Sequence, residues 1–156
     1  MKITKDFAGL VDIGWAYKFE GSIETIEEIE ISLGGKWLFV TGGIEAGEGI
    51  EAGGGIEAGE GIKAGGGIEA GGGIEAGGGI EAGGSIKAGE GIKAGGGIIL
   101  GLSIKCKKVL SFRFHLFAGT ATWKIPSPDE RVIECAEIRG GEIKHGDVRL
   151  IAKDDK

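Results

Sequence analysis

Ile44-Glu45-Ala46-Gly47-Glu48-Gly49 is the first full copy of a six-residue unit that is repeated along the middle of the chain. Isoleucine recurs at every sixth position from Ile44 to Ile104, which makes eleven copies in unbroken register. Nine of these isoleucines are followed by a charged residue, an alanine and a glycine. A fixed short period of this kind is typical of a fold in which similar units stack along one axis.

Each unit can be divided into a short strand and a corner. Side chains in a strand alternate between two faces, so Ile44 and Ala46 point to one side while Glu45 points to the other. The residues that follow are mostly glycine, which can take positive φ at a corner without a clash from a Cβ atom. The pattern therefore predicts an all-β fold, a β-solenoid with isoleucine and alanine inside and charged side chains in water.

Other repetitive structures do not fit this pattern. An amphipathic helix needs apolar residues at steps of three and four, and glycine fills up to half of each unit here. A collagen helix needs abundant proline, whereas this chain has only Pro126 and Pro128. A flexible glycine-rich linker would not keep isoleucine in register.

The number of sides per coil follows less directly from the repeat. Leu38 begins a degenerate unit one step before Ile44, so residues 38–106 contain twelve units. Three sides would give four coils and two sides would give six, with coils stacked about 4.8 Å apart. Charge pairing between coils does not separate the two arrangements, because each places some like charges together. We favour three sides, because a glycine corner after every strand suits a triangular cross-section.

The flanks of the repeat differ from it and from each other. Residues 1–37 are rich in aromatic and aliphatic side chains, and we interpret them as an N-terminal cap with an irregular first coil, since a bare strand edge would invite polymerisation. The period breaks after Cys106 and resumes at Ile133. Residues 107–132 are therefore expected to form one inserted β-hairpin, and residues 133–156 to form terminal coils and a tail.

The repeat unit resembles the hexapeptide repeats of left-handed β-helix proteins, in which an aliphatic and a small residue point inward two positions apart. In that family the small residue usually comes first, whereas here alanine follows isoleucine, so the resemblance does not extend to handedness. Three five-residue segments at 136–140, 141–145 and 146–150 are similar to pentapeptide repeats.

Neither a metal site nor a cofactor is expected. Cys106 and Cys135 both occur as Ile-x-Cys, in the position that alanine fills elsewhere. We interpret them as buried, unpaired thiols that act as small apolar residues, with a disulfide between them as the alternative. A metal site at these thiols would need further ligands, which the sequence does not place nearby.

Charge is divided unevenly along the chain. Residues 1–43 carry a net charge of −3, residues 44–98 carry −6 and residues 99–156 carry +3. Regularly spaced carboxylates on a rigid rod can imitate the phosphate track of a duplex and attract proteins that bind nucleic acid. The resemblance to pentapeptide-repeat proteins, some of which are acidic DNA mimics, implies the same function. The alternative is that these charges only keep the solenoid soluble.

Three further functions were weighed. The resemblance to hexapeptide-repeat proteins implies an acyltransferase, which would use a histidine as general base. His115 and His145 are the only histidines; no partner acid, nucleotide loop or acyl-carrier motif accompanies His115, and His145 is expected in a terminal turn. Basic and aromatic residues between 105 and 124 are compatible with binding nucleic acid directly, but the net charge of −6 opposes it. The near-identical coils also suit a self-assembling scaffold, which the dissimilar flanks disfavour.

We predict a non-enzymatic, protein-binding β-solenoid, with an acidic DNA-mimic inhibitor of the phage anti-defence type as its most specific form. The expected partner is another protein, which in the DNA-mimic form of the prediction binds nucleic acid; no membrane partner is expected, and a homo-oligomer is compatible with the sequence. The chain opens with no signal-like segment and contains no apolar run of transmembrane length, so a cytoplasmic location is predicted. The expected partner-binding residues are acids of the repeat and three residues of the inserted segment: Glu45, Glu48, Glu51, Glu57, Glu60, Glu69, Glu75, Glu81, Arg113, His115 and Trp123.

Overall fold

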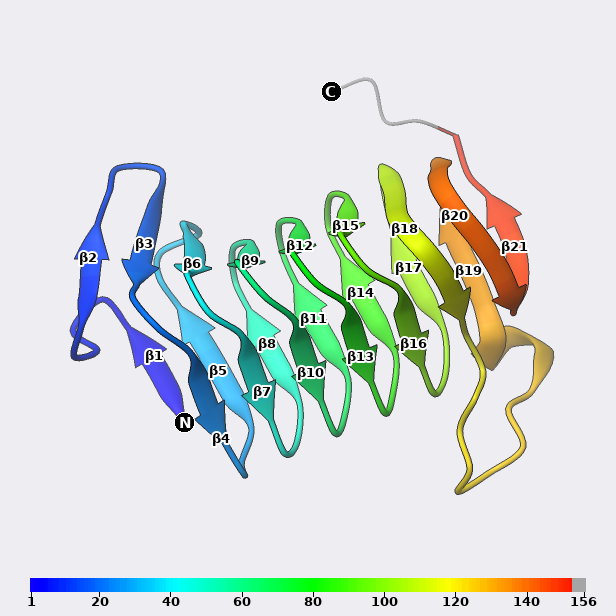
Figure 1. Cartoon of the computed structure of the whole chain (residues 1–156), viewed down its shortest axis with the longest axis horizontal. Helices are drawn as coiled ribbons and strands as arrows, with labels where there is room; N and C mark the ends of the chain where they lie inside the picture. The colour runs from blue at the N-terminus through cyan, green and yellow to red at the C-terminus, as the bar shows by residue number, and fades with distance from the viewer. Residues whose placement is uncertain (153–156) are drawn as a thin grey trace.

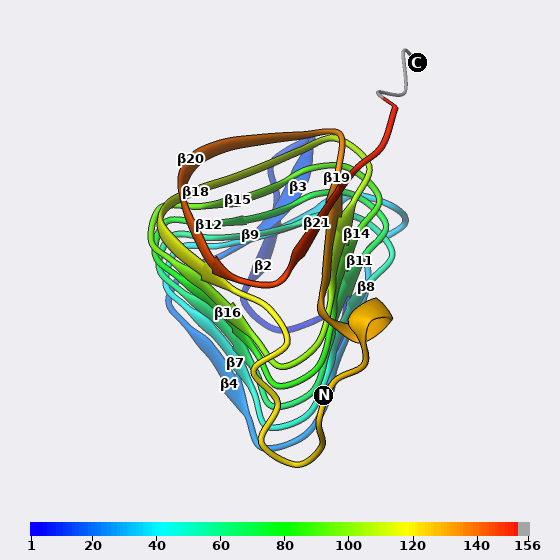
Figure 2. The same ribbon diagram turned by 90° about the vertical axis from the view of Figure 1, so that its right-hand side faces the viewer.

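Parallel pairing of strands eighteen residues apart sets the architecture. Ile44 pairs with Ile62 and Ile62 pairs with Ile80, so that isoleucine stacks on isoleucine and alanine on alanine. A step of eighteen residues is three six-residue units, which means three sides per coil, as the glycine corners predicted. The computed structural model describes residues 1–152 and is a β-solenoid of about eight coils with a triangular cross-section (Figure 1, Figure 2).

The three sides are ladders of short parallel strands, and we name them A, B and C. Side A contains β1 (Lys2–Thr4), β5 (Ile29–Ser32), β8 (Ile50–Ala52), β11 (Ile68–Ala70), β14 (Ile86–Ala88), β17 (Ile104–Cys106), β19 (Val132–Cys135) and β21 (Asp147–Leu150). Side B contains β2 (Leu10–Asp12), β3 (Ala16–Phe19), β6 (Trp37–Val40), β9 (Ile56–Ala58), β12 (Ile74–Ala76) and β15 (Ile92–Ala94). Side C contains β4 (Ile23–Thr25), β7 (Ile44–Ala46), β10 (Ile62–Ala64), β13 (Ile80–Ala82) and β16 (Ile98–Leu100). The longer strands β18 (Val109–Phe117) and β20 (Glu137–His145) bend from side B to side C.

The core is the column of isoleucine and alanine side chains inside the triangle. Ile56, Ile74 and Ile80 are fully buried, and the alanines of the same strands are buried beside them. Burying one such isoleucine contributes about 1.5–3 kcal/mol. No polar or charged side chain is buried within residues 1–152. The alternation read from the sequence is therefore confirmed.

In every unit but one, the glycine that follows the alanine is required by close stacking rather than by an unusual φ; the exception is Gly53, where a Cβ atom would meet nothing within 4 Å. No glycine of the repeat has positive φ, so the prediction made for the corners was wrong. A Cβ atom built on Gly65 would overlap the carbonyl oxygen of Gly47, and one built on Gly83 would overlap that of Gly65. The backbones of successive corners lie too close together for any side chain at this position.

The N-terminal end of the stack is closed. β1 pairs with β5, and β2 and β3 form an antiparallel hairpin whose second strand pairs with β6. Partly buried side chains of Met1, Phe7, Leu10 and Phe19 pack against the core at this end. The first full coil is longer than the others, because Ile23 pairs with Ile44, twenty-one residues away.

Residues 107–132 do not form the β-hairpin predicted from the break in the period. β18 pairs in parallel with β15 and β16, so it is a regular part of the coil. Leu110, Phe112 and Leu116 are buried in the core. Residues 118–131 form the connection from β18 to β19; its first residues still stack on the preceding coil, and it ends in the short 3-10 helix η1 (Pro128–Arg131).

The last coil is shorter than the others. Ile133 pairs with Val148, fifteen residues later, so each side advances by five residues instead of six. This step matches the five-residue spacing of aliphatic residues in the C-terminal sequence. No helix within the described part of the chain is long and apolar enough to cross a membrane.

Candidate protein-binding surface

The eight glutamates predicted to bind a partner do not share one flank. Six of them lie in pairs on the three sides, with Glu51 and Glu69 on side A, Glu57 and Glu75 on side B and Glu45 and Glu81 on side C. Glu48 and Glu60 lie at two different corners, after β7 and after β9. A six-residue unit on a three-sided coil sends successive glutamates to successive sides. The expectation of a single acidic flank was therefore wrong.

A denser acidic surface lies around the corner between sides C and A, near the N-terminus. Glu24 lies beside Glu45 on side C, and Glu30 lies beside Glu51 on side A, followed by Glu69. At the corner itself, the backbone N–H of Glu48 donates to the carbonyl oxygen of Glu27 (3.4 Å), which stacks the two turns. We call this surface the acidic corner, made up of Glu24, Glu27, Glu28, Glu30, Glu45, Glu48, Glu51 and Glu69.

Half of the acidic corner was missed by the sequence analysis. The missed residues precede the regular repeat, in the segment expected to form an irregular first coil: Glu24, Glu27, Glu28 and Glu30. The signal was present, because Ile23 and Ile29 are six residues apart like the isoleucines of the repeat. Once that segment is a coil, its four acids must fall next to those of β7 and β8.

Few cations balance these carboxylates. The N-terminal ammonium group lies 3.5 Å from Glu27, and Lys2 lies 3.8 Å from Glu30, both at the surface. Within residues 1–152 the other members of the acidic corner form no ion pair, and Glu24–Glu45, Glu30–Glu51 and Glu51–Glu69 place like charges on adjacent strands. Like charges directly opposite each other are destabilising. A cationic partner would relieve that repulsion.

An exposed apolar side chain lies within the acidic corner. Ile26 is 90% exposed between Glu24 and Glu27, at the turn between β4 and β5. Beside it on side A, a shallow groove of about 330 Å³ is lined by Glu28, Glu51 and Glu69 over Gly49 and Gly67, with Lys87 at its C-terminal end. An apolar centre surrounded by a polar rim is a common arrangement at protein interfaces.

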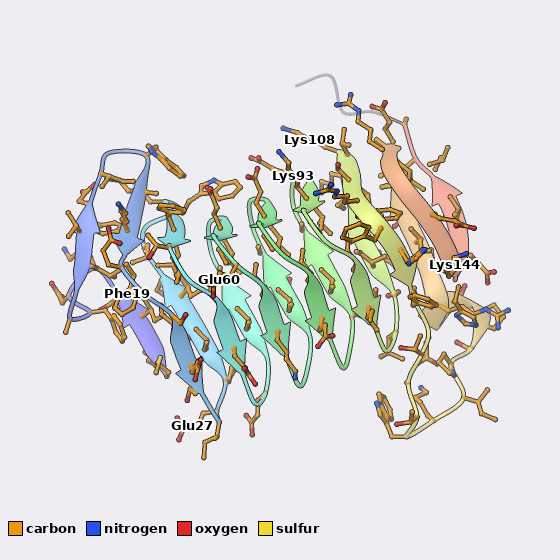
Figure 3. The ribbon with its side chains drawn as sticks, viewed as in Figure 1. Phe19, Glu27, Glu60, Lys93, Lys108 and Lys144 are labelled. Carbon is orange, nitrogen blue, oxygen red and sulfur yellow. The ribbon has the colours of Figure 1, made fainter. Side chains whose placement is uncertain are left out.

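The charge changes sign along the axis of the solenoid. In Figure 3, Glu27 and Glu60 lie in the N-terminal half, and Lys93, Lys108 and Lys144 lie in the C-terminal half. On side A the outward column runs through Glu30, Glu51 and Glu69 and then through Lys87 and Lys105. The uneven charge of the sequence is thus an axial gradient of the folded molecule.

Arg113, His115 and Trp123 do not come together, contrary to the prediction that one hairpin carries them. Arg113 and His115 lie where β18 bends between sides B and C; the Arg113 N–H donates to the Gly96 carbonyl oxygen (3.1 Å). Trp123 lies in the loop of residues 118–131, which stacks on the corner between sides C and A through the hydrogen bond from the Ala121 N–H to the Gly101 carbonyl oxygen (3.0 Å). In Figure 1 that loop projects from the lower edge of the stack, and the turn between β4 and β5 lies at the same edge. Trp123 and the acidic corner therefore lie at opposite ends of one edge.

The histidines are held by local contacts. His145 forms a hydrogen bond through Nδ1 to the carbonyl oxygen of Ala118, and the His115 ring packs against Phe117 with centroids 6.3 Å apart. Within residues 1–152 no carboxylate forms a hydrogen bond or ion pair with either ring, although Glu142 lies opposite His115 on the adjacent strand β20. These contacts place the two histidines in the coil, not in a shared site.

The cysteines are buried and free. Burial raises the pKa of Cys106 to about 12, and the neighbouring Cys135 adds to the rise. Burial also raises the pKa of Cys135. Both thiols thus stay protonated at neutral pH and act as small apolar side chains. Among the described residues no cluster of three His, Cys, Asp or Glu side chains could hold a metal ion.

These observations define a class of protein, a three-sided β-solenoid with an acidic N-terminal half and a closed N-terminal end. No family model matches the chain, and neither a curated protein nor a solved structure does.

Proposed function

We propose that this β-solenoid is a non-enzymatic binding protein that docks a basic surface of another protein along its acidic corner. The observation that carries the proposal is the concentration of eight carboxylates around an exposed isoleucine, with few cations to balance them. The strand ladder fixes the backbone that carries the carboxylates before binding, so little backbone entropy is lost when the partner docks.

The spacing of the charges supports a partner that normally binds nucleic acid. The first two coils contribute seven carboxylates to the acidic corner. Two coils span about 10 Å along the axis, so these seven carboxylates amount to about one negative charge per 1.4 Å. Duplex DNA carries about one negative charge per 1.7 Å of its axis. In its most specific form the proposal is a DNA mimic that inhibits a nucleic-acid-binding protein by occupying its basic site.

Affinity capture from a bacterial lysate, at low and high salt, tests the proposal. The variant removes three charges from the acidic corner through Glu28→Gln, Glu48→Gln and Glu51→Gln. A matched control removes three charges elsewhere through Glu60→Gln, Glu75→Gln and Glu90→Gln. The affinity of the corner variant for a salt-sensitive, nucleic-acid-binding partner is expected to fall by about tenfold, which corresponds to about 1.4 kcal/mol of binding free energy.

Two results would contradict the proposal. Equal loss of the partner in the two variants would show that only net charge matters, not the acidic corner. Retention of the chain on DNA itself would assign it to direct nucleic-acid binding instead. If a partner is captured, adding DNA should displace it, because mimicry requires both to occupy the same basic site.

A further inference from the structure

The two ends of the solenoid are unlike each other. At the N-terminal end the core side chains Ile3, Ala16 and Ile23 are all buried. At the C-terminal end the core positions of the last coil are open, with Val148 49% exposed and Leu150 63% exposed. Val148 continues the ladder of Ile133, and Leu150 continues that of Cys135, so both side chains lie at core positions of the last described coil.

The open end is apolar on all three sides. Ile138 and Ile143 end the core ladders of sides B and C, where they lie beside Leu110 and Leu116 and are only partly buried. The chain continues the ladder of β19 as far as the Ile151 N–H, which donates to the Cys135 carbonyl oxygen (2.9 Å). Within residues 1–152, the last coil therefore presents an apolar floor that no further coil covers, and the outer backbone edges of β20 and β21 pair with no other strand.

The charges around this floor are balanced. β20 and β21 carry three acids and three bases, apart from His145. Arg139 pairs with Glu137 (3.1 Å), Lys144 with Glu142 (3.0 Å) and Asp147 with Arg131 (2.9 Å). An edge with alternating charge and no net charge can face a copy of itself without repulsion. The acidic N-terminal end cannot do so.

We infer that two copies of this chain join through their C-terminal coils. The two identical ends are related by a two-fold axis, which makes the contact self-complementary. Such an axis reverses the winding of one coil relative to the other, so the abutting edges of β20 and β21 run antiparallel and can form a regular hydrogen-bonded ladder. The pairing closes at a dimer, because the N-terminal end of each copy is covered by β1 and the β2–β3 hairpin. This inference does not depend on the function of the acidic corner.

Light scattering after size-exclusion chromatography, over a dilution series, tests the dimer. The unmodified chain is expected at twice its mass of 16.0 kDa. Val148→Lys and Leu150→Lys, made singly, are each expected to return it to the mass of one chain, because a charge would be buried between the two floors. Both side chains are already exposed, so these substitutions leave the fold intact. Val11→Lys, at a residue that is 59% exposed on the N-terminal hairpin, is the matched control and should remain dimeric.

Hydrogen exchange then locates the contact. The edge amides of β20 and β21 should exchange more slowly in the unmodified chain than in Leu150→Lys, while those of β10 exchange equally in both. A monomeric unmodified chain would overturn the inference, as would assemblies larger than a dimer. A dimer that survives both C-terminal substitutions, or that is lost equally in Val11→Lys, would show that the copies meet elsewhere.

Discussion

At the scale of single residues, the repeat keeps glycine where two backbones meet. Except at Gly53, the glycine after each alanine of the repeat lies against the corner of the preceding coil, and a Cβ atom there would overlap a carbonyl oxygen. Its φ is not in the left-handed region, so the usual reason for glycine in a turn does not apply. The next corner position is less tight, since a Cβ atom on Gly66 would lie 3.2 Å from the nearest backbone atom, and Glu48, Glu60 and Glu90 occupy this position in other units. The recurrence of glycine after alanine therefore reflects packing between coils and not only the geometry of a turn.

Two alanine substitutions separate these reasons for glycine. Gly65→Ala should lower the free energy of unfolding by about 1–3 kcal/mol, because the corner backbones must move apart. Gly53→Ala is the matched control, since its Cβ atom would meet nothing within 4 Å. That variant should be neutral or more stable by about 0.4–1 kcal/mol, through the reduced entropy of its unfolded chain. Urea unfolding of both variants measures the difference; equal destabilisation would contradict the packing argument.

At the scale of strands, the predictions succeeded where the unit was regular. Sequence alone predicted the strands from Ile44 to Cys106, their buried faces and the three sides. It failed at β18, where leucine and phenylalanine replace isoleucine and alanine. Leu110 and Leu116 still stand six and twelve residues after Ile104. The larger Phe112 fits an alanine position because Gly141 leaves room for its ring in the next coil. The sequence alone could not predict this exchange of size between Phe112 and Gly141, because it depends on which residues lie opposite each other in successive coils.

Glu57 on β9 gives side B a pH-dependent stability. Burial raises the pKa of its carboxyl group above the ordinary value of 4.5, and the adjacent Glu75 adds to the rise. The folded state therefore favours the protonated carboxyl, so this stabilising contribution is present at acidic pH and is lost as the pH rises through the raised pKa. Glu57→Gln, which resembles the protonated form, should raise the melting temperature at neutral pH and have little effect below pH 4.5. A variant that is no more stable than the parent at neutral pH would contradict this. Glu60→Gln at an exposed corner is the control.

At the scale of the whole molecule, coil geometry decides which charges meet. The sequence showed that acids dominate residues 24–90, but it could not show where they gather, because that depends on the number of sides and on the extra residues of the first coil. Three sides disperse the acids of the regular repeat around the shaft. They also bring four acids of the first coil next to those of the second. The acidic corner is thus a product of the register between coils.

Spin labels on the acidic corner test that register most directly. Cysteines introduced by Glu51→Cys and Glu69→Cys can be labelled in the folded protein, because Cys106 and Cys135 are buried and burial raises the pKa of each. The account predicts strong spin–spin broadening for this pair, eighteen residues apart on adjacent strands of side A. The pair Glu57→Cys and Glu69→Cys, twelve residues apart, should show none, since β9 and β11 lie on different sides. Broadening in the second pair and not in the first would mean a two-sided coil, and the acidic corner would not exist.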